Sequence, residues 1–176
     1  MRPAARLTLA AGGIRARGPI GPEPPAPSVR RGDPMSVAGP AWALAMLREA
    51  RVGRLATADA EGRPLVVPVC YAFDGERCYS AVDAKPKRTR RLRRLDNVEA
   101  NPHVSLVIDE YDEDWGRLAW VIVEGRAVVL REGEDFGRAI DLLTAKYAQY
   151  RTMGLDRRSG AVIAIAPDRL LAWRAA

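Results

Sequence analysis

Residues 54–83 read RLATADAEGRPLVVPVCYAFDGERCYSAVD, and this stretch decides the fold. Its apolar, β-branched and aromatic runs are separated by two turn sequences, AEGR and DGER. That pattern is typical of antiparallel strands joined by hairpins, so it predicts a three-stranded antiparallel meander. Pro68 interrupts the strongest run, and proline cannot donate a hydrogen bond to a neighbouring strand. We therefore expect an edge, a bulge or a ligand-facing segment at Pro68.

The two cysteines, Cys70 and Cys78, flank the Asp74-Gly75 dipeptide of the second turn. A two-residue loop at that dipeptide pairs Cys70 with Tyr79 across the hairpin. The two thiols then point to opposite faces of the sheet, where they cannot easily form a disulfide. Free thiols are typical of reducing compartments, so we expect a cytoplasmic protein.

The rest of the chain completes a small β protein. Apolar periodicity predicts helices at residues 41–50 and 134–150. Strands are expected at residues 104–109, at 118–130 as one long strand or a pair bent at Gly125, and as a final pair at 161–166 and 170–175. Six or seven strands with two or three helices predict a mainly β fold with helices, built as a small antiparallel β-barrel.

Two of the strand sequences lack a polar side. PLVVPV at residues 64–69 and LAWVIV at residues 118–123 show no alternation of apolar and polar side chains. Strands of this kind are buried on both faces, and in a small barrel a partner subunit often supplies the second cover. The sequence therefore predicts a homodimer.

The amino-terminal residues 1–36 differ in composition from the domain that we expect at residues 37–176. Residues 1–34 hold seven of the 13 prolines, together with repeated glycine and alanine. Such a segment cannot bury enough apolar surface to offset the entropy of ordering, so we expect a disordered tail. Globular composition begins near Met35, which suggests that translation starts there; the intact mass of the native protein tests this hypothesis.

Charge and hydropathy narrow the classes of partner. Six arginines and two acids in residues 1–34 supply +4 of the formal net charge of +6. The high pI therefore belongs mostly to the tail, and this distribution of charge argues against nucleic-acid binding by the folded part. No apolar run reaches the roughly 18 residues of a membrane span, so we expect a soluble protein without membrane contact.

A basic stretch, DAKPKRTRRLRRL, occupies residues 83–95 and holds seven lysine and arginine residues. Pro86 disfavours a helical Lys85, so we expect a helix to begin near Arg88 or Thr89, with the Thr89 hydroxyl as its cap. A loop that enters a helix presents free N–H groups to an anion, and here Lys85, Lys87 and Arg88 add charge.

The same stretch also has a structural interpretation. Helical spacing from Arg90 places Arg93, Arg94 and Asn97 on one outward face, while Leu92 and Leu95 dock the helix on the barrel. For Arg91 and Arg94 we favour a solvated face balanced by Asp96 and Glu99. For Lys87 and Arg88 we favour the anion site.

Few other signals for chemistry are present. His103 is the only histidine, and it lies at the start of a strand where a structural role is expected; no metal site is predicted. No residue is identified as a catalytic acid or base, and dinucleotide, hydrolase and P-loop motifs do not occur. Trp115, Trp120 and Tyr111 fit either a ligand cleft or core and interface packing.

The order and spacing of these segments resemble a known family. Residues 54–83, followed by KPKRTRRLRRL at 85–95, NPHVSLVID at 101–109 and YDEDWGRLAWVIVEGRA at 111–127, resemble the pyridoxamine 5′-phosphate oxidase-like split β-barrels. Within them the chain is most similar to the coenzyme F420-dependent oxidoreductases. The resemblance spans nearly all of residues 40–176.

The resemblance implies a homodimer with a flavin-like cofactor in each of two interface clefts. In that family the backbone of the second strand lies along the ring system, which corresponds to Val66, Val67 and Pro68. The basic loop binds the phosphate. The resemblance thus implies that Lys87, Arg88 and Thr89 bind the phosphate, with Lys85 and Arg90 nearby.

Three cofactors and one further ligand remain open. Seven basic residues exceed what the single phosphate of FMN requires, which favours the deazaflavin F420 with its phosphodiester and glutamate tail. The expected reaction is hydride transfer between the deazaflavin and a small organic substrate, with the ring supplying the chemistry. The alternatives are an FMN-dependent oxidase or reductase, a non-catalytic flavin- or haem-binding protein, and a nucleic-acid-binding protein.

Overall fold

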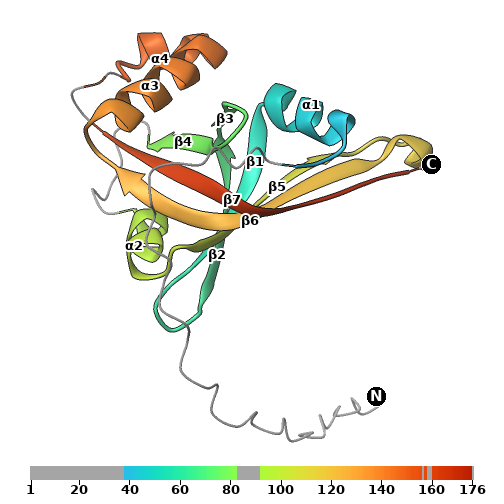
Figure 1. Cartoon of the computed structure of the whole chain (residues 1–176), viewed down its shortest axis with the longest axis horizontal. Helices are drawn as coiled ribbons and strands as arrows, with labels where there is room; N and C mark the ends of the chain where they lie inside the picture. The colour runs from blue at the N-terminus through green and yellow to red at the C-terminus, as the bar shows by residue number, and fades with distance from the viewer. Residues whose placement is uncertain (1–37, 83–91, 156, 158–159, 176) are drawn as a thin grey trace, which may run out of the picture. The chain divides into compact units, whose positions relative to one another are not determined.

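The computed structural model describes residues 38–82, 92–155, 157 and 160–175. Seven strands form one sheet in the order β2-β1-β5-β6-β7-β4-β3, and every neighbouring pair is antiparallel. The predicted mainly β barrel with helices is confirmed (Figure 1). The strands are β1 (Val52–Ala58), β2 (Pro64–Cys70), β3 (Ala72–Phe73), β4 (Cys78–Val82), β5 (His103–Glu110), β6 (Ala119–Leu130) and β7 (Ala161–Arg174). The helices are α1 (Ala41–Glu49), α2 (Arg93–Ala100), α3 (Glu134–Lys146), α4 (Ala148–Thr152) and the short 3-10 turn η1 (Trp115–Arg117).

The sheet curls because one segment of chain forms both of its edges. Strand β2 pairs with β1 at one edge, and β3 pairs with β4 at the other. Only Tyr71 separates β2 from β3. Adjacent residues cannot lie at opposite sides of a flat sheet of this width, so the edges must approach each other and close a barrel.

The predicted three-stranded meander is therefore wrong. The segment PLVVPVCYAF is two strands with different partners, and its second hairpin has Phe73 opposite Cys78. That register leaves a four-residue loop at residues 74–77 instead of the expected two-residue loop. The carboxylate of Asp74 accepts hydrogen bonds from the backbone N–H groups of Glu76 and Arg77, which stabilises the longer turn.

Two consequences drawn from the hairpin still hold. Cys78 is buried in the barrel core, whereas Cys70 packs against the second cluster on the other side of the sheet, and both thiols are free. Pro68 lies on an edge strand, as its missing N–H predicts. The opposite placement of the cysteines survives the changed register because β2 and β3 keep the alternation of a continuous chain.

Two apolar clusters hold the fold together. The first fills the barrel and includes Leu55, Leu106 and Ile163. The second lies between α3 and the outer side of β4 and β7, where Phe136 and Leu143 are fully buried. Figure 1 shows α3 and α4 together at this end of the sheet. Each fully buried aliphatic or aromatic side chain contributes roughly 1.5–3 kcal/mol of hydrophobic stabilisation.

Two further elements differ from their prediction. The helix expected at residues 134–150 is broken at Tyr147, whose backbone is extended with φ −125° and ψ 102°. The expected final pair of strands is the single strand β7, which pairs with β6 along its whole length. A register shift lies between Glu124 and Gly125, where a Cβ atom at Gly125 would stand 2.2 Å from the carbonyl oxygen of Ala166.

The break at Tyr147 has a hydrogen-bonding reason. Its hydroxyl accepts the N–H of Tyr71 at 3.1 Å and lies 2.7 Å from the carbonyl oxygens of Tyr71 and Arg51. The buried Tyr71 hydroxyl donates to the carbonyl of Leu47 at 2.7 Å. The Tyr147 hydroxyl thus provides hydrogen-bond partners for the backbone N–H and carbonyl of Tyr71, the residue between β2 and β3.

None of the helices among the described residues has the length and apolar character that crossing a bilayer requires. The predicted disordered tail at residues 1–36 lies outside the described residues.

Replacing Tyr147 with Phe should lower the free energy of unfolding by about 1–3 kcal/mol, because buried backbone groups of Tyr71 lose their partner. Urea unfolding measures this change. Tyr111→Phe is the matched control, since Tyr111 is 69% exposed, and its change should stay within about 0.5 kcal/mol. Equal unfolding midpoints for the two variants would show that the hydroxyl of Tyr147 does not stabilise the strand switch.

Candidate functional site

Five of the predicted site residues, Lys85, Lys87, Arg88, Thr89 and Arg90, lie outside the described residues. The described chain stops at Val82, which pairs with Ala161, and resumes at Leu92. Leu92 is extended, with φ −102° and ψ 112°, and helix α2 begins at Arg93. The predicted helix start near Arg88 or Thr89 is therefore wrong, because Leu92 occupies the N-cap position of α2.

Helix α2 is fixed to the start of the barrel by a buried polar contact. Asn97 is 2% exposed and its side-chain nitrogen donates to the hydroxyl of Thr57, itself 3% exposed, at 3.0 Å. The prediction that Asn97 faces outward with the arginines is wrong, because this hydrogen bond turns it inward. Leu95 packs against the core as expected. Arg93 lies 3.7 Å from the carboxylate of Asp59, at the end of β1.

The basic stretch therefore ends beside the β1–β2 hairpin. Residue 92 leads directly into a helix that contacts Thr57 and Asp59 at the carboxyl end of β1. Pro64, the first residue of β2, pairs with Ala58 at the same end. The described end of the basic stretch, from Leu92 on, thus lies close to the first residue of β2, the strand predicted to bind the ring.

The three residues predicted to contact the ring lie on edge strand β2. Val66 is 60% exposed and Pro68 is also exposed, whereas Val67 packs against the barrel core. Backbone groups of an edge strand that point away from its only neighbour are free to bond a ligand. The strand therefore offers an apolar outer surface together with unpaired backbone groups.

An open hollow of about 600 Å³ adjoins this surface. It lies on the outer side of the sheet and mixes apolar walls with hydrogen-bonding side chains. Its lining comes from five strands, β1, β2, β5, β6 and β7, at Ala56, Thr57, Ala58, Pro64, His103, Val104, Ser105, Glu124, Gly125, Asp168 and Arg169. We call it the hairpin hollow.

Register explains why these residues meet. Val66 pairs with Ala56, Ala56 with Ser105, Ser105 with Glu124, and Glu124 with Arg169. Paired residues point to the same face of a sheet, so all five belong to the outer face. Arg169 lies 3.9 Å from the Glu124 carboxylate across that face. No sequence motif marks this row, because its members come from five strands.

The neighbouring rows of the outer face are apolar. Ile122 of β6 pairs with Leu171 of β7, and Trp120 pairs with Trp173. The two indoles stack with centroids 6.4 Å apart, and Trp173 is 45% exposed. The segment LAWVIV therefore lacks polar residues because its outward-facing side chains belong to an apolar surface that faces solvent. Trp115, left open from sequence, is 70% exposed in the turn before β6.

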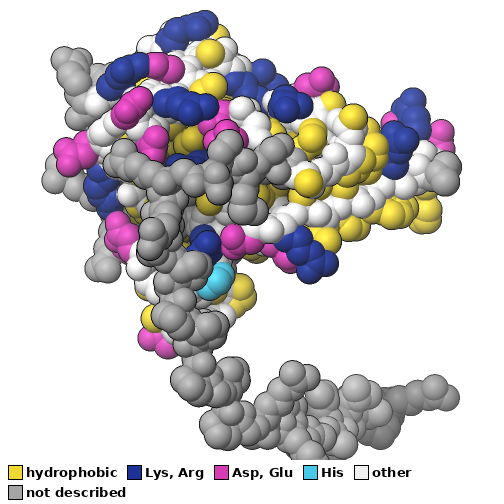
Figure 2. Space-filling view, in the orientation of Figure 1, with side chains coloured by type: hydrophobic (Ala, Val, Ile, Leu, Met, Phe, Trp, Pro, Cys, Tyr) yellow, Lys and Arg dark blue, Asp and Glu magenta, His cyan; other side chains and the backbone are white. Residues whose placement is uncertain are grey.

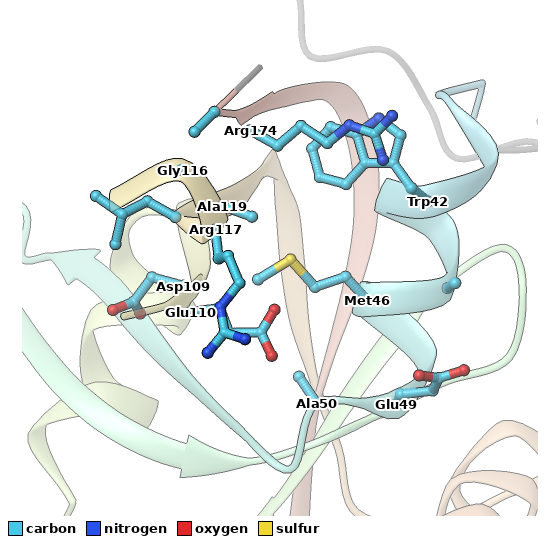
Figure 3. A pocket seen from close by; sticks show the side chains of 13 residues that line it. Trp42, Met46, Glu49, Ala50, Asp109, Glu110, Gly116, Arg117, Ala119 and Arg174 are labelled. Carbon is cyan, nitrogen blue, oxygen red and sulfur yellow. The ribbon is translucent and has the colours of Figure 1, made fainter. Parts of the chain in front are cut away.

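A second, larger groove of about 780 Å³ lies between α1 and the ends of β5, β6 and β7 (Figure 3). These ends, at residues 108–110, 119–121 and 172–174, extend past the last pairing with β1, and we call them the arm. In Figure 2 apolar side chains follow the arm. Trp42 and Met46 of α1 face the arm across this groove.

The groups with the most perturbed proton affinities lie elsewhere. Burial raises the pKa of Tyr71 and of Cys78 far above their ordinary values, and burial lowers the pKa of Lys146. The Lys146 ammonium donates to the carbonyls of Arg48 and Ala50 at 2.8 and 2.7 Å, which satisfies the end of α1. These groups stabilise the packing of α1 and do not point to acid–base catalysis.

Metal chemistry has no support in the described part of the chain. No group of three His, Cys, Asp or Glu side chains there is arranged to hold a metal ion. His103 is exposed at the rim of the hairpin hollow, next to Ser105.

Comparison with known proteins assigns the family. Residues 41–174 match the pyridoxamine 5′-phosphate oxidase family. The chain belongs to this family. The match covers the whole barrel from α1 to the end of β7, so it includes the entire lining of the hairpin hollow and all of the groove's lining except Ala175. The family resemblance seen in the sequence is confirmed.

A relative from Streptomyces rimosus subsp. rimosus is a 5a,11a-dehydrotetracycline/5a,11a-dehydrooxytetracycline reductase. The two chains are 33% identical over 91 residues, which are 51% of this chain and 63% of the relative. The match thus spans less than two thirds of the relative's own length.

Solved structures share the fold but differ in the cofactors that their names give. A FAD-binding protein from Mesorhizobium loti is 25% identical, with a TM-score of 0.57 over 73% of this chain and 87% of its own. An F420 reductase is 22% identical, with a TM-score of 0.55 over 76% and 98%. HutZ, the haem storage protein from Vibrio cholerae, is 18% identical, with a TM-score of 0.61 over 75% and 93%. The fold alone therefore does not select the cofactor.

Replacing Asn97 with Ala should lower the free energy of unfolding by about 1–3 kcal/mol, because the buried Thr57 hydroxyl loses its partner. Hydrogen exchange of the α2 amides should accelerate with it. Glu99→Ala on the same helix removes only an exposed ion pair with Arg131, so its cost should stay below about 1 kcal/mol. Similar protection of α2 in the two variants would contradict the anchoring role of Asn97.

Proposed function

We propose that this protein is an oxidoreductase that transfers a hydride between the deazaflavin F420 and a small organic substrate. The observation that carries the proposal is the convergence of three features at one end of β2. The end of the basic stretch, the exposed edge strand and the hairpin hollow meet there. Membership of the pyridoxamine 5′-phosphate oxidase family and the reductase relative support it.

The residues present fit a flat, anionic cofactor. Val66 and Pro68 provide exposed apolar surface for a ring, and Val67 holds the strand on the core. Ser105 and Arg169 supply hydrogen-bond donors from the hollow. When bound, the deazaflavin supplies the hydride chemistry, and the protein binds, orients and excludes water.

Lys85, Lys87, Arg88, Thr89 and Arg90 are proposed to bind the phosphate and the acidic tail. Each charge-assisted hydrogen bond contributes roughly 1.5–3 kcal/mol. The number of cations favours F420 over FMN, because FMN presents one phosphate. A flavin-dependent reaction of the oxidase type is the alternative within the same family.

We further propose that the cofactor site is completed by a second copy of the chain. The hairpin hollow is open, and the outer face beside it exposes Val66 and Trp173. A second copy that covers the stacked Trp120–Trp173 pair would bury this apolar surface and close the hollow. The acceptor would then react away from bulk water.

Binding should separate the cofactors. Titration of the purified protein with F420, FMN and haem, followed by fluorescence or absorbance, should give micromolar affinity for F420 alone. The variant Lys87→Ala/Arg88→Ala should bind F420 at least about 100-fold more weakly, because two charge-assisted contacts are lost. Arg131→Ala/Arg151→Ala removes the same charge from described helical and loop surfaces and should leave the affinity unchanged. Tight FMN binding without F420 binding would indicate a flavin-dependent enzyme of the oxidase type. Tight binding of haem alone would contradict the proposed oxidoreductase function.

The dimer is tested by a pair of variants with similar exposure. Trp173→Glu places a charge at a residue that is 45% exposed on the outer face, and Val128→Glu does so at 50% exposure farther along β6. Sedimentation velocity should show a dimer for the wild type and Val128→Glu, and a monomer for Trp173→Glu. A monomeric wild type would contradict the proposed dimer. A dimer for all three proteins would show that the stacked tryptophans do not form its interface.

A further inference from the structure

The groove between α1 and the arm is chemically distinct from the hairpin hollow. The two share no lining residue. Between its charged ends the groove is lined by small residues of α1 and the arm, among them Ala45, Ala50 and Ala119, together with Met46. Such a surface suits a planar hydrocarbon framework, because small side chains leave room for close stacking.

One end of the groove carries a positive charge held on an aromatic ring. The guanidinium of Arg174 lies over the indole of Trp42, 5.3 Å from its centroid. Figure 3 shows the two side chains lying across each other at the rim. No carboxylate of the described residues forms an ion pair with Arg174. The cation–π contact orients the guanidinium and leaves N–H donors for an anion.

The other end of the groove is acidic. Glu110 and Arg117 both line this end of the groove (Figure 3). Arg117 forms its ion pair with Asp112, and that guanidinium holds the pKa of Asp112 below its usual range. Within the described part of the chain the Glu110 side chain forms no ion pair or hydrogen bond, so its oxygens are available to a donor.

The groove begins where the proposed ring site ends. Pro68 of β2 pairs with Arg54, and the guanidinium of Arg54 forms an ion pair with Asp109. Asp109 lines the groove. The Arg54–Asp109 ion pair therefore connects the residue that pairs with Pro68 to the rim of the groove, while Glu110, Ala119 and Arg174 form one row on the inner face of the arm. A ligand in the groove would lie next to that ion pair, whereas the hairpin hollow lies toward helix α2, whose Asn97 bonds the hollow's Thr57.

We propose that the groove between α1 and the arm binds the hydride acceptor. It selects a flat organic anion whose acidic group contacts Arg174 and whose far end donates a hydrogen bond to Glu110. The binding site stands on the groove itself, and only the assignment of its ligand as the acceptor rests on the proposed function.

Calorimetric titration with 6-hydroxy-2-naphthoate tests the proposal, since this probe carries an acid and a hydroxyl on a flat frame. We expect saturable binding that weakens at least about tenfold in Arg174→Gln, the loss of one charge-assisted hydrogen bond. Arg169→Gln is the matched control on the same strand, because Arg169 lines the hairpin hollow, and it should leave the affinity unchanged.

Two simpler probes assign the ends of the groove. The affinity of 2-naphthol, which lacks the acid, should not respond to Arg174→Gln. The affinity of 2-naphthoate, which lacks the hydroxyl, should not fall in Glu110→Gln, whereas that of 6-hydroxy-2-naphthoate should. In NMR spectra the indole N–H signal of Trp42 should shift with the probe and that of Trp115 should not.

The outcomes separate this proposal from the proposed function. The proposed binding site in the groove is wrong if the wild type gives no saturable heat. It is also wrong if Arg169→Gln loses affinity and Arg174→Gln does not. If the protein binds the naphthoate but not F420, the groove is a ligand site and the proposed F420 cofactor is wrong. If Arg174→Gln leaves the affinity for F420 unchanged and raises the KM for the acceptor, both the proposed function and the acceptor site in the groove are supported. A KM unchanged in Arg174→Gln shows that the groove does not bind the acceptor.

Discussion

The fold depends on how the backbone of Tyr71 is satisfied. The chain leaves one edge of the sheet at Cys70 and joins the other edge at Ala72, so Tyr71 belongs to neither ladder. Its N–H and carbonyl bond to the hydroxyl of Tyr147, and its own hydroxyl bonds to the end of α1. Without these partners, buried backbone groups would remain unpaired at the point where the barrel closes.

That closure determines where chemistry is possible. Because the chain itself joins β2 to β3, the outer face of β2 stays open while its inner face packs on the core. The same curvature brings α2 against Thr57 and turns the arm toward α1. The Arg54–Asp109 ion pair lies between the two hollows, because Arg54 pairs with Pro68 and Asp109 lines the groove. The proposed cofactor and acceptor sites are thus separate but connected by this pair.

Charge is divided between the two sites in a consistent way. The basic stretch continues into α2, where Arg93 reaches Asp59 beside the hairpin hollow. In the groove, by contrast, the Arg174 guanidinium on Trp42 stands at one end and the carboxylate of Glu110 at the other, while Arg117 is paired with Asp112. The first arrangement suits a strongly anionic cofactor, and the second suits a smaller ligand with one acidic end. This division would keep each ligand from competing for the other site.

The sequence by itself determined the mainly β class, the edge position of Pro68, the opposed cysteines and the family, because these follow from local alternation and from the order of motifs. Only the tertiary structure decided the partner change at Tyr71, the break at Tyr147 and the inward turn of Asn97. Each of these depends on a hydrogen bond between residues 40 or more positions apart. No local period encodes such a contact, and neither hollow is contiguous in sequence, so both the curled sheet and its sites required the folded chain.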